Sequence, residues 1–149
     1  MAKYNQQSKQ STIIKACSIN IGGYSTRSQF VLNKYVDEEN MDFIAMQETL
    51  SADLTKLELH NMNVFCDTNN AKNRGAALYI NNKHSLTKLE SISKLSKQID
   101  SCWGLAVIHN KRIIIGSIYV KHNYKTAIDD VIKMLQAAQD KQKQLKASS

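Results

Sequence analysis

The order of secondary-structure signals along this chain predicts an α+β fold, with one mixed β-sheet and helices packed mainly on one of its faces. Short apolar runs of strand length recur along the chain, and helical periodicity appears near both ends. Two strong strand candidates also stand next to each other in the second half. A chain of 149 residues with 42% hydrophobic residues can bury a sizeable core, as one domain or part of one.

Strand signals occur as apolar runs bounded by glycine, asparagine or charged residues. The predicted strands cover residues 12–21, 41–47, 62–66, 75–80, 102–108 and 112–120. Only His109, Asn110 and Lys111 separate the last two strands, which indicates a β-hairpin. The stretch His84–Lys97 fits a helix face, because leucine and isoleucine recur every three residues, but it also fits an edge strand.

Helical signals occur in three places. The first helix begins after a cap at Ser25 or Ser28 and runs to about Glu39. A short second helix is expected after Ser51, which is also a capping residue. The third covers Ala127–Ala138, where apolar residues recur on one face.

The two polar ends of the chain hold most of its positive charge. The net charge is +7, and residues 16–139 contribute only +2 of it. Residues 1–11 and 140–149 are expected to be a flexible N-terminus and a polar basic tail around a domain spanning 12–139. Basic ends help to hold a polyanion but do not define a specific site.

Composition also bears on location and on redox chemistry. The apolar runs are too short to span a membrane, and the N-terminal residues lack the apolar core of a signal peptide. An intracellular protein without a membrane partner is expected, in the nucleus or the cytoplasm. Cys17, Cys66 and Cys102 lack metal-ligand spacing, and Cys17 and Cys102 lie in strand-like runs typical of buried reduced thiols.

Three polar residues stand inside or at the ends of apolar strands. Glu48 follows the second predicted strand, where a rigid element would hold its carboxylate as a ligand for a hard metal ion or leave it solvated. Asn20 lies in an otherwise apolar strand and either meets a ligand or caps the following Gly-Gly turn. Tyr119 leads into a basic loop that contains Lys121, although a core tyrosine with a bonded hydroxyl is the alternative.

These residues belong to a series of short motifs with a fixed order. The series is Ser-Ile-Asn-Ile-Gly, Met-Asp-Phe-Ile-Ala-Met-Gln-Glu-Thr, Asn-Arg-Gly-Ala-Ala-Leu-Tyr-Ile, Ile-Asp-Ser-Cys-Trp and Ile-Gly-Ser-Ile-Tyr-Val. It resembles the first half of the endonuclease/exonuclease/phosphatase (DNase I-like) superfamily, particularly the apurinic-type endonuclease domains of non-LTR retrotransposons. The resemblance covers about residues 12–139 and implies roughly half of a four-layer αββα sandwich.

The resemblance also implies roles for individual residues. Glu48 matches the family's ligand for Mg²⁺, for which Mn²⁺ can substitute, and Asn20 matches the asparagine beside the metal and the scissile phosphate. Tyr119 matches the tyrosine that hydrogen-bonds near the phosphate, and Arg74 matches a position near the nucleic-acid backbone. Further candidates for phosphate contacts in the loop after Tyr119 are Lys121 and His122.

Two family motifs are absent from the sequence: Gly-Asp-x-Asn, whose aspartate activates water, and Ser-Asp-His near the C-terminus. The expected function is therefore Mg²⁺-dependent phosphodiester hydrolysis by an endonuclease-like domain that is incomplete by itself. A non-catalytic nucleic-acid-binding module, a retroelement remnant and a phosphatase for small phosphoesters are the alternatives. DNA is the expected partner. A single sheet would also expose an apolar face, so we expect a second half-domain to cover that face or the chain to associate with itself.

Overall fold

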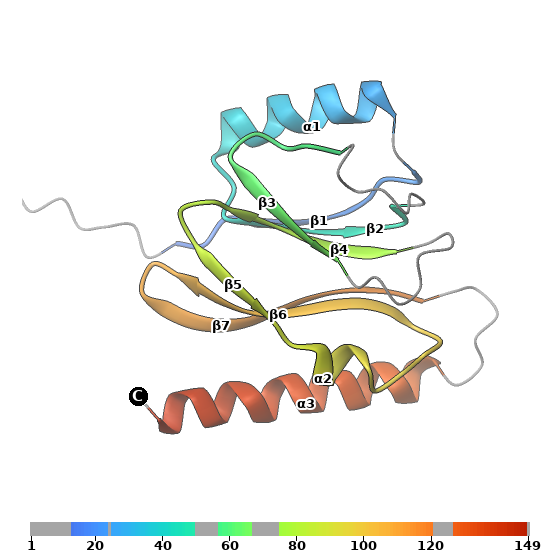
Figure 1. Ribbon diagram of the computed structural model, residues 1–149, viewed down its shortest axis with the longest axis vertical. Helices are drawn as coiled ribbons and strands as arrows, with labels where there is room; N and C mark the ends of the chain where they lie inside the picture. Colours follow the sequence, from blue (N-terminus) through green and yellow to red (C-terminus); the bar gives the residue numbers. More distant parts are fainter. Residues whose placement is uncertain (1–12, 24, 50–56, 67–74, 121–126, 149) are drawn as a thin grey trace, which may run out of the picture.

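Two β-sheets lie face to face, and helices cover the outer side of each sheet (Figure 1). The computed structural model describes residues 13–23, 25–49, 57–66, 75–120 and 127–148. The short helix expected after Ser51 begins outside these residues. The predicted α+β class is confirmed, and the order of layers is helix, sheet, sheet, helix.

The first sheet is mixed, with the strand order β1-β2-β4-β3. Its strands are β1 (Ala16–Asn20), β2 (Phe43–Gln47), β3 (Met62–Cys66) and β4 (Ala76–Asn81). Strands β1 and β2 are parallel, whereas β4 runs antiparallel to both of its neighbours. A helix connects β1 to β2, as parallel neighbours require.

That connecting helix, α1 (Thr26–Glu39), has the ends that its sequence predicts. The Ser25 side chain accepts a hydrogen bond from the Ser28 backbone N–H at 3.0 Å, and the Ser28 hydroxyl accepts one from the Ser25 N–H at 3.0 Å. Asn40 ends the helix in the left-handed conformation, with φ 50°.

The second sheet is antiparallel, with the order β5-β6-β7. Its strands are β5 (Ser85–Lys88), β6 (Asp100–Ile108) and β7 (Lys111–Tyr119). The ambiguous stretch 84–97 contains both an edge strand and a short helix, α2 (Glu90–Ser93). The predicted hairpin is confirmed: His109 and Asn110 have φ of 50° and 64° and form the two-residue turn between β6 and β7.

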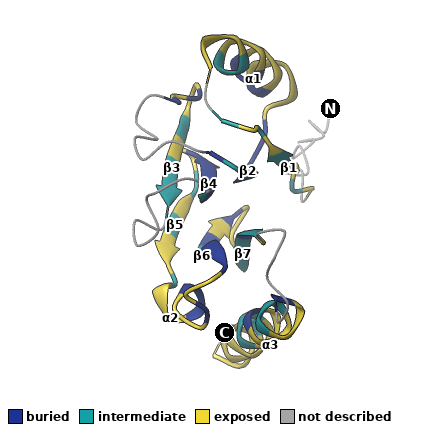
Figure 2. Ribbon diagram, turned by 90° about the vertical axis from the view of Figure 1, so that its right-hand side faces the viewer, coloured by how far each residue is buried: buried dark blue, intermediate teal, exposed yellow. Residues whose placement is uncertain are grey.

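Apolar side chains fill the spaces between the four layers, and the buried positions, dark blue in Figure 2, concentrate in β2, β4 and β6. The residues buried between the sheets are Ala45, Leu78, Ile80, Cys102, Ala106, Ile108 and Ile115. Trp103 lies on the opposite face of β6, in the core beneath α2 and the last helix, with its ring against Gly116. Trp103 is therefore a core residue.

The prediction of a single sheet with an exposed apolar face is wrong for the described residues. Strands β5, β6 and β7 pair with one another in a separate antiparallel sheet, and apolar side chains of β6 and β7 pack against the first sheet. Ala45, Leu78 and Ile80 are therefore only 8%, 0% and 1% exposed. The apolar face that predicted a second half-domain or self-association is covered within the chain.

The last helix, α3 (Ala127–Ala147), is longer than the predicted helix ending at Ala138 and continues through a segment expected to be a flexible tail. Gln142 explains why. Its side-chain Nε2 donates to the Arg112 carbonyl at 2.9 Å, and its Oε1 accepts from the Ile114 N–H at 2.9 Å. The Gln142 amide thus hydrogen-bonds to backbone groups at the edge of β7 and anchors the helix to the second sheet. No helix in the described ranges has the length and apolar character that crossing a membrane requires.

The cysteines lie much as their sequence context predicts. Cys102 is buried and its thiol donates to the Phe65 carbonyl at 3.3 Å. Cys17 is half-buried, and burial raises the pKa of its thiol above the ordinary value. All three cysteines are free thiols.

Tyr79 provides a test of the packing between α1 and the first sheet. The side chain is 1% exposed, and its hydroxyl donates to the Leu57 carbonyl at 2.9 Å. We expect Tyr79→Phe to lower the free energy of unfolding by about 1–3 kcal/mol, because the buried carbonyl loses its donor. Urea denaturation at neutral pH measures this change, with Tyr35→Phe on the exposed face of α1 as the control.

The burial of Tyr79 also predicts that the folded protein loses stability in alkaline solution. Burial, with a smaller effect from Cys66, raises the pKa of Tyr79 far above its ordinary value of 10.0. The unfolded tyrosine ionises near that ordinary value while the folded one stays neutral, so stability is unaffected at lower pH and falls as pH rises above about 10. The fall should be smaller in Tyr79→Phe. Equal slopes of stability against pH in the two proteins would contradict the assignment.

Candidate active site

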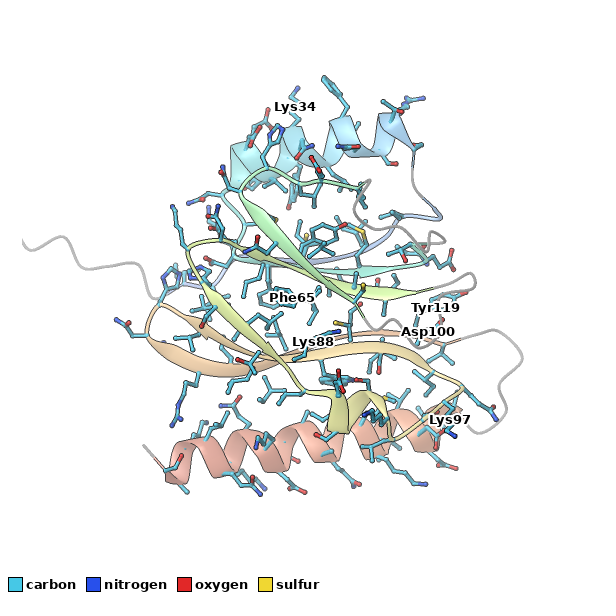
Figure 3. All side chains as sticks on the ribbon, in the orientation of Figure 1. Lys34, Phe65, Lys88, Lys97, Asp100 and Tyr119 are labelled. Atoms are coloured by element: carbon cyan, nitrogen blue, oxygen red, sulfur yellow. The ribbon has the colours of Figure 1, made fainter. Side chains whose placement is uncertain are left out.

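The candidate active site lies at the end of the sandwich where β1, β2 and β7 finish. Register places Asn20 beside Gln47 at the ends of the parallel pair, and Asp100 opposite Tyr119 in the second sheet. Asp100 and Tyr119 are labelled at this end of the molecule in Figure 3. Residues from distant parts of the sequence therefore meet at one edge of both sheets.

Alternation along the strands decides which side chains face the space between the sheets. In β1, Cys17 and Ile19 pack toward α1, so Asn20 lies on the face toward the second sheet. In β7, Ile118 packs toward α3, so Tyr119 lies on the face toward the first sheet. Asn20 and Tyr119 approach the same region from opposite sheets.

Asn20 shapes the backbone that follows β1. Its Oδ1 accepts a hydrogen bond from the Gly22 N–H at 3.2 Å, so the turn-capping role that the sequence left open is present. Gly22 and Gly23 both have positive φ, of 59° and 103°. The side chain is exposed and keeps its amide donors, so it can cap the turn and contact a ligand together.

Glu48 follows β2 with a backbone conformation that few residues adopt. Its φ is 51°, in the left-handed region, and its carbonyl accepts from the Gly23 N–H at 2.8 Å. Among the described residues, none hydrogen-bonds or forms an ion pair with the half-exposed Glu48 carboxylate. The backbone is thus fixed while the carboxylate remains available to a ligand.

The residue after Glu48 is held by a close contact that only glycine permits. Thr49 is 2% exposed, and a Cβ atom at Gly75 would lie 2.6 Å from the Thr49 Oγ1. Gly75 therefore allows the start of β4 to approach the end of β2. This contact gives a structural reason for the glycine that immediately precedes β4.

A chain of hydrogen bonds beside Glu48 links three strands and was missed from the sequence. Gln47 Nε2 donates to Ser117 Oγ at 3.0 Å, and the Ser117 hydroxyl donates to the Met46 carbonyl at 2.8 Å. Gln47 Oε1 also accepts from the Ser18 hydroxyl at 3.2 Å. A serine within an apolar strand does not by itself indicate such a role. In the structure, the hydrogen bonds of Ser117 fix the two sheets relative to each other at this end.

The structure thus brings Asn20, Glu48 and Tyr119 to one end of the sandwich and adds Asp100, which is 6% exposed. The remaining sequence-predicted contacts, Arg74, Lys121 and His122, lie outside the described residues. Their phosphate-binding roles stay predictions.

The donor set at this end suits a hard divalent cation. Glu48 offers carboxylate oxygens directly after β2, and Asn20, which pairs in register with Gln47, offers an amide oxygen at the same edge of the sheet. Mg²⁺ is commonly held by one or two carboxylates, with water and substrate phosphates completing its shell. The residues present fit a weakly bound Mg²⁺ or Mn²⁺ ion.

Comparisons with known proteins identify this architecture. No protein-family model and no curated protein matches the sequence. An endonuclease/exonuclease/phosphatase family protein from Bacteroides thetaiotaomicron superposes with a TM-score of 0.60 at 13% identity, covering 91% of this chain and 57% of that one. D. rerio TDP2 complexed with single-strand DNA product gives a TM-score of 0.57 at 10% identity, covering 87% and 54%.

A third solved structure is a mannosyl-6-phosphatase from B. thetaiotaomicron, with a TM-score of 0.58 at 14% identity and coverage of 89% and 59%. The chain thus has the fold of the endonuclease/exonuclease/phosphatase superfamily. It spans somewhat more than half the length of these solved chains. At such low identity the similarity shows the fold alone, and function must be argued from the site.

The link between the sheets beside Glu48 is testable through Ser117. We expect Ser117→Ala to lower the free energy of unfolding by about 1–3 kcal/mol, because the buried Met46 carbonyl loses a donor and the half-buried Gln47 amide loses its acceptor. Ser18→Ala, which removes one exposed bond, should change it by less than about 0.5 kcal/mol. Equal effects in chemical denaturation would argue against the link.

Proposed function

We propose that this chain supplies the metal-binding and phosphate-binding side of a site for hydrolysing phosphodiesters in nucleic acid. One observation carries the proposal: Asn20, Glu48 and Tyr119 reach the same end of the sandwich from three strands of two sheets. Rigid strands position ligands better than loops do. The resemblance found in the sequence gives these same residues their roles.

Each residue has a role that matches its chemistry. Glu48 binds Mg²⁺ or Mn²⁺ through its carboxylate, and Asn20 directs its amide toward the phosphate. Tyr119 donates a hydrogen bond from its hydroxyl to a phosphate oxygen. An ion held there would supply positive charge that offsets the negative charge on the phosphate group.

Nucleic acid is the substrate class we favour. D. rerio TDP2, which has the same fold, was solved with a single-strand DNA product. The motif series resembles retrotransposon endonucleases, and the net charge of +7 suits a polyanion. Contacts from Arg74, Lys121 and His122 would extend the site along the backbone of the nucleic acid.

A small phosphoester is the second candidate substrate, because a mannosyl-6-phosphatase shares the fold at a similar TM-score. Both substrates present a phosphate group to the same metal-binding side. A competition experiment distinguishes the two substrates. If a sugar phosphate displaces bound DNA at stoichiometric concentration, a phosphatase function is favoured. If the sugar phosphate does not displace the DNA, a nucleic-acid substrate is favoured.

The first experiment measures binding rather than hydrolysis, because the sequence lacks both Gly-Asp-x-Asn and Ser-Asp-His. We expect Mg²⁺ to tighten binding of a single-stranded DNA oligonucleotide, measured by fluorescence anisotropy against a sample with chelator. Glu48→Gln should remove this Mg²⁺-dependent gain, which we place at roughly tenfold. Binding in chelator should stay unchanged.

Glu38→Gln is the matched control, because Glu38 is an exposed glutamate on α1 that pairs with Lys34 at 3.9 Å. It should bind DNA as the wild type does. Affinity that depends on salt but responds neither to Mg²⁺ nor to Glu48→Gln would instead identify a non-catalytic binding module.

Hydrolysis is tested by nicking of supercoiled plasmid in the presence of Mg²⁺. Any nicking by the wild type should fall by about 100-fold or more in Glu48→Gln, because charge on the phosphate is no longer neutralised. Equal nicking by the wild type, Glu48→Gln and Glu38→Gln would show contamination and reject hydrolysis by this chain.

A further inference from the structure

A second group of ligand-type side chains lies at the opposite end of the sandwich from Glu48. Asp42 immediately precedes β2, whereas Glu48 immediately follows it. His84 lies in the turn between β4 and β5, and His109 in the turn between β6 and β7. Both turns lie at the end of the molecule where β2 begins (Figure 1).

The three side chains meet around the Asp42 carboxylate. His84 Nε2 is 2.7 Å from Asp42 Oδ1, and His109 Nε2 is 3.5 Å from Asp42 Oδ2. The two imidazole rings pack edge to face, with centroids 5.3 Å apart. All of the ligand atoms lie within 4.8 Å of one another.

Backbone contacts hold the group in place. The Lys15 N–H donates to Asp42 Oδ2 at 2.8 Å, and the Asn81 N–H donates to the Asp42 carbonyl at 2.8 Å. The His84 N–H donates to the Asn81 carbonyl at 2.9 Å, which orders the turn that carries this histidine. The side chains of Asp42 and His84 are only 11% and 9% exposed. Such support around a ligand set is typical of metal sites.

His109 is presented by an uncommon backbone. Its φ of 50° in a two-residue hairpin turn is a position that asparagine or glycine usually occupies. Histidine tolerates this conformation better than most residues but rarely needs it. An unusual conformation that directs a side chain into a cluster points to a function for that side chain.

Opposing effects act on the Asp42 carboxyl. Burial by itself raises its pKa, but the hydrogen bonds from the Lys15 N–H and His84, with the electrostatic effect of the two histidines, hold that pKa below the ordinary value of 3.8. The site itself is defined by the geometry of the three side chains.

We propose that Asp42, His84 and His109 bind a divalent transition-metal ion, and that Zn²⁺ is the ion the set suits. Two imidazole nitrogens and one carboxylate oxygen are zinc ligands, whereas Mg²⁺ prefers oxygen alone. Ligands on a tetrahedral zinc lie roughly 3.3 Å apart, given bonds of about 2.0 Å. The two imidazole nitrogens lie 2.7 and 3.5 Å from the two different Asp42 oxygens, and one ligand atom from each residue lies within 4.8 Å of the others, so the side chains must adjust to enclose an ion.

The bound ion would join both sheets at this end. Asp42 belongs to the first sheet, His109 to the second, and His84 to the turn that connects them. Three protein ligands leave a fourth position for water or a partner's ligand. The site is separate from the proposed Mg²⁺ site and does not depend on it.

The test is titration of the whole chain with ZnCl₂ by calorimetry and with CoCl₂ by visible absorption. We expect one ion per chain and the d–d bands of tetrahedral cobalt with nitrogen and oxygen ligands. His109→Gln should weaken binding by roughly tenfold or more. His109 is 31% exposed in a hairpin turn, so we expect this variant to keep the fold, and circular dichroism checks that it does.

His60→Gln is the matched control, because the His60 side chain pairs with Asp37 at 3.0 Å and both side chains are more than half exposed. Neither this variant, nor His122→Gln, nor Glu48→Gln should change zinc affinity. Unchanged affinity in folded His109→Gln, an absence of saturable binding, or thiolate-to-cobalt charge-transfer bands would overturn the proposal, since the last would place the ion on cysteine.

Discussion

The packing of the two sheets against each other is the constraint on which the rest of the structure depends. Small residues on the facing strands, such as Ala45 and Ala106, let the sheets approach, and Leu78, Ile80 and Ile108 fill the space between them. These side chains are almost completely buried, and their removal from water is the main force that holds the layers together. Once the inner faces are joined, strand ends from both sheets meet at each end of the sandwich.

Strand β2 connects the two ends. It lies inside the first sheet, between β1 and β4, and has Asp42 before it and Glu48 after it. The two ends differ in chemistry. One offers carboxylate and amide oxygens beside a half-buried tyrosine, whereas the other offers imidazole nitrogens around one buried carboxylate. A single rigid strand can therefore position two sites for different ions without bringing them into contact.

Unusual backbone conformations occur at both ends. Glu48 and His109 have positive φ although neither is glycine. Such conformations persist only where the surroundings hold them, and here a bond from the Gly23 N–H and a tight hairpin do so. The shared superfamily fold explains the frame of the molecule, but fold does not specify chemistry, so the proposed functions depend on these individual residues.

The sequence by itself determined the local structure: the serine cap of α1, the strand Met62–Cys66 and the His109-Asn110 hairpin all follow from short-range patterns. It also marked Asn20, Glu48 and Tyr119, because polar residues at the ends of apolar strands stand out in a single sequence. Only the tertiary structure decided that the strands divide into two sheets, that Gln47 reaches Ser117, and that Asp42, His84 and His109 meet. Contacts between residues far apart in the chain leave no periodic signal in the sequence, since they depend on which apolar faces of the strands pack against each other.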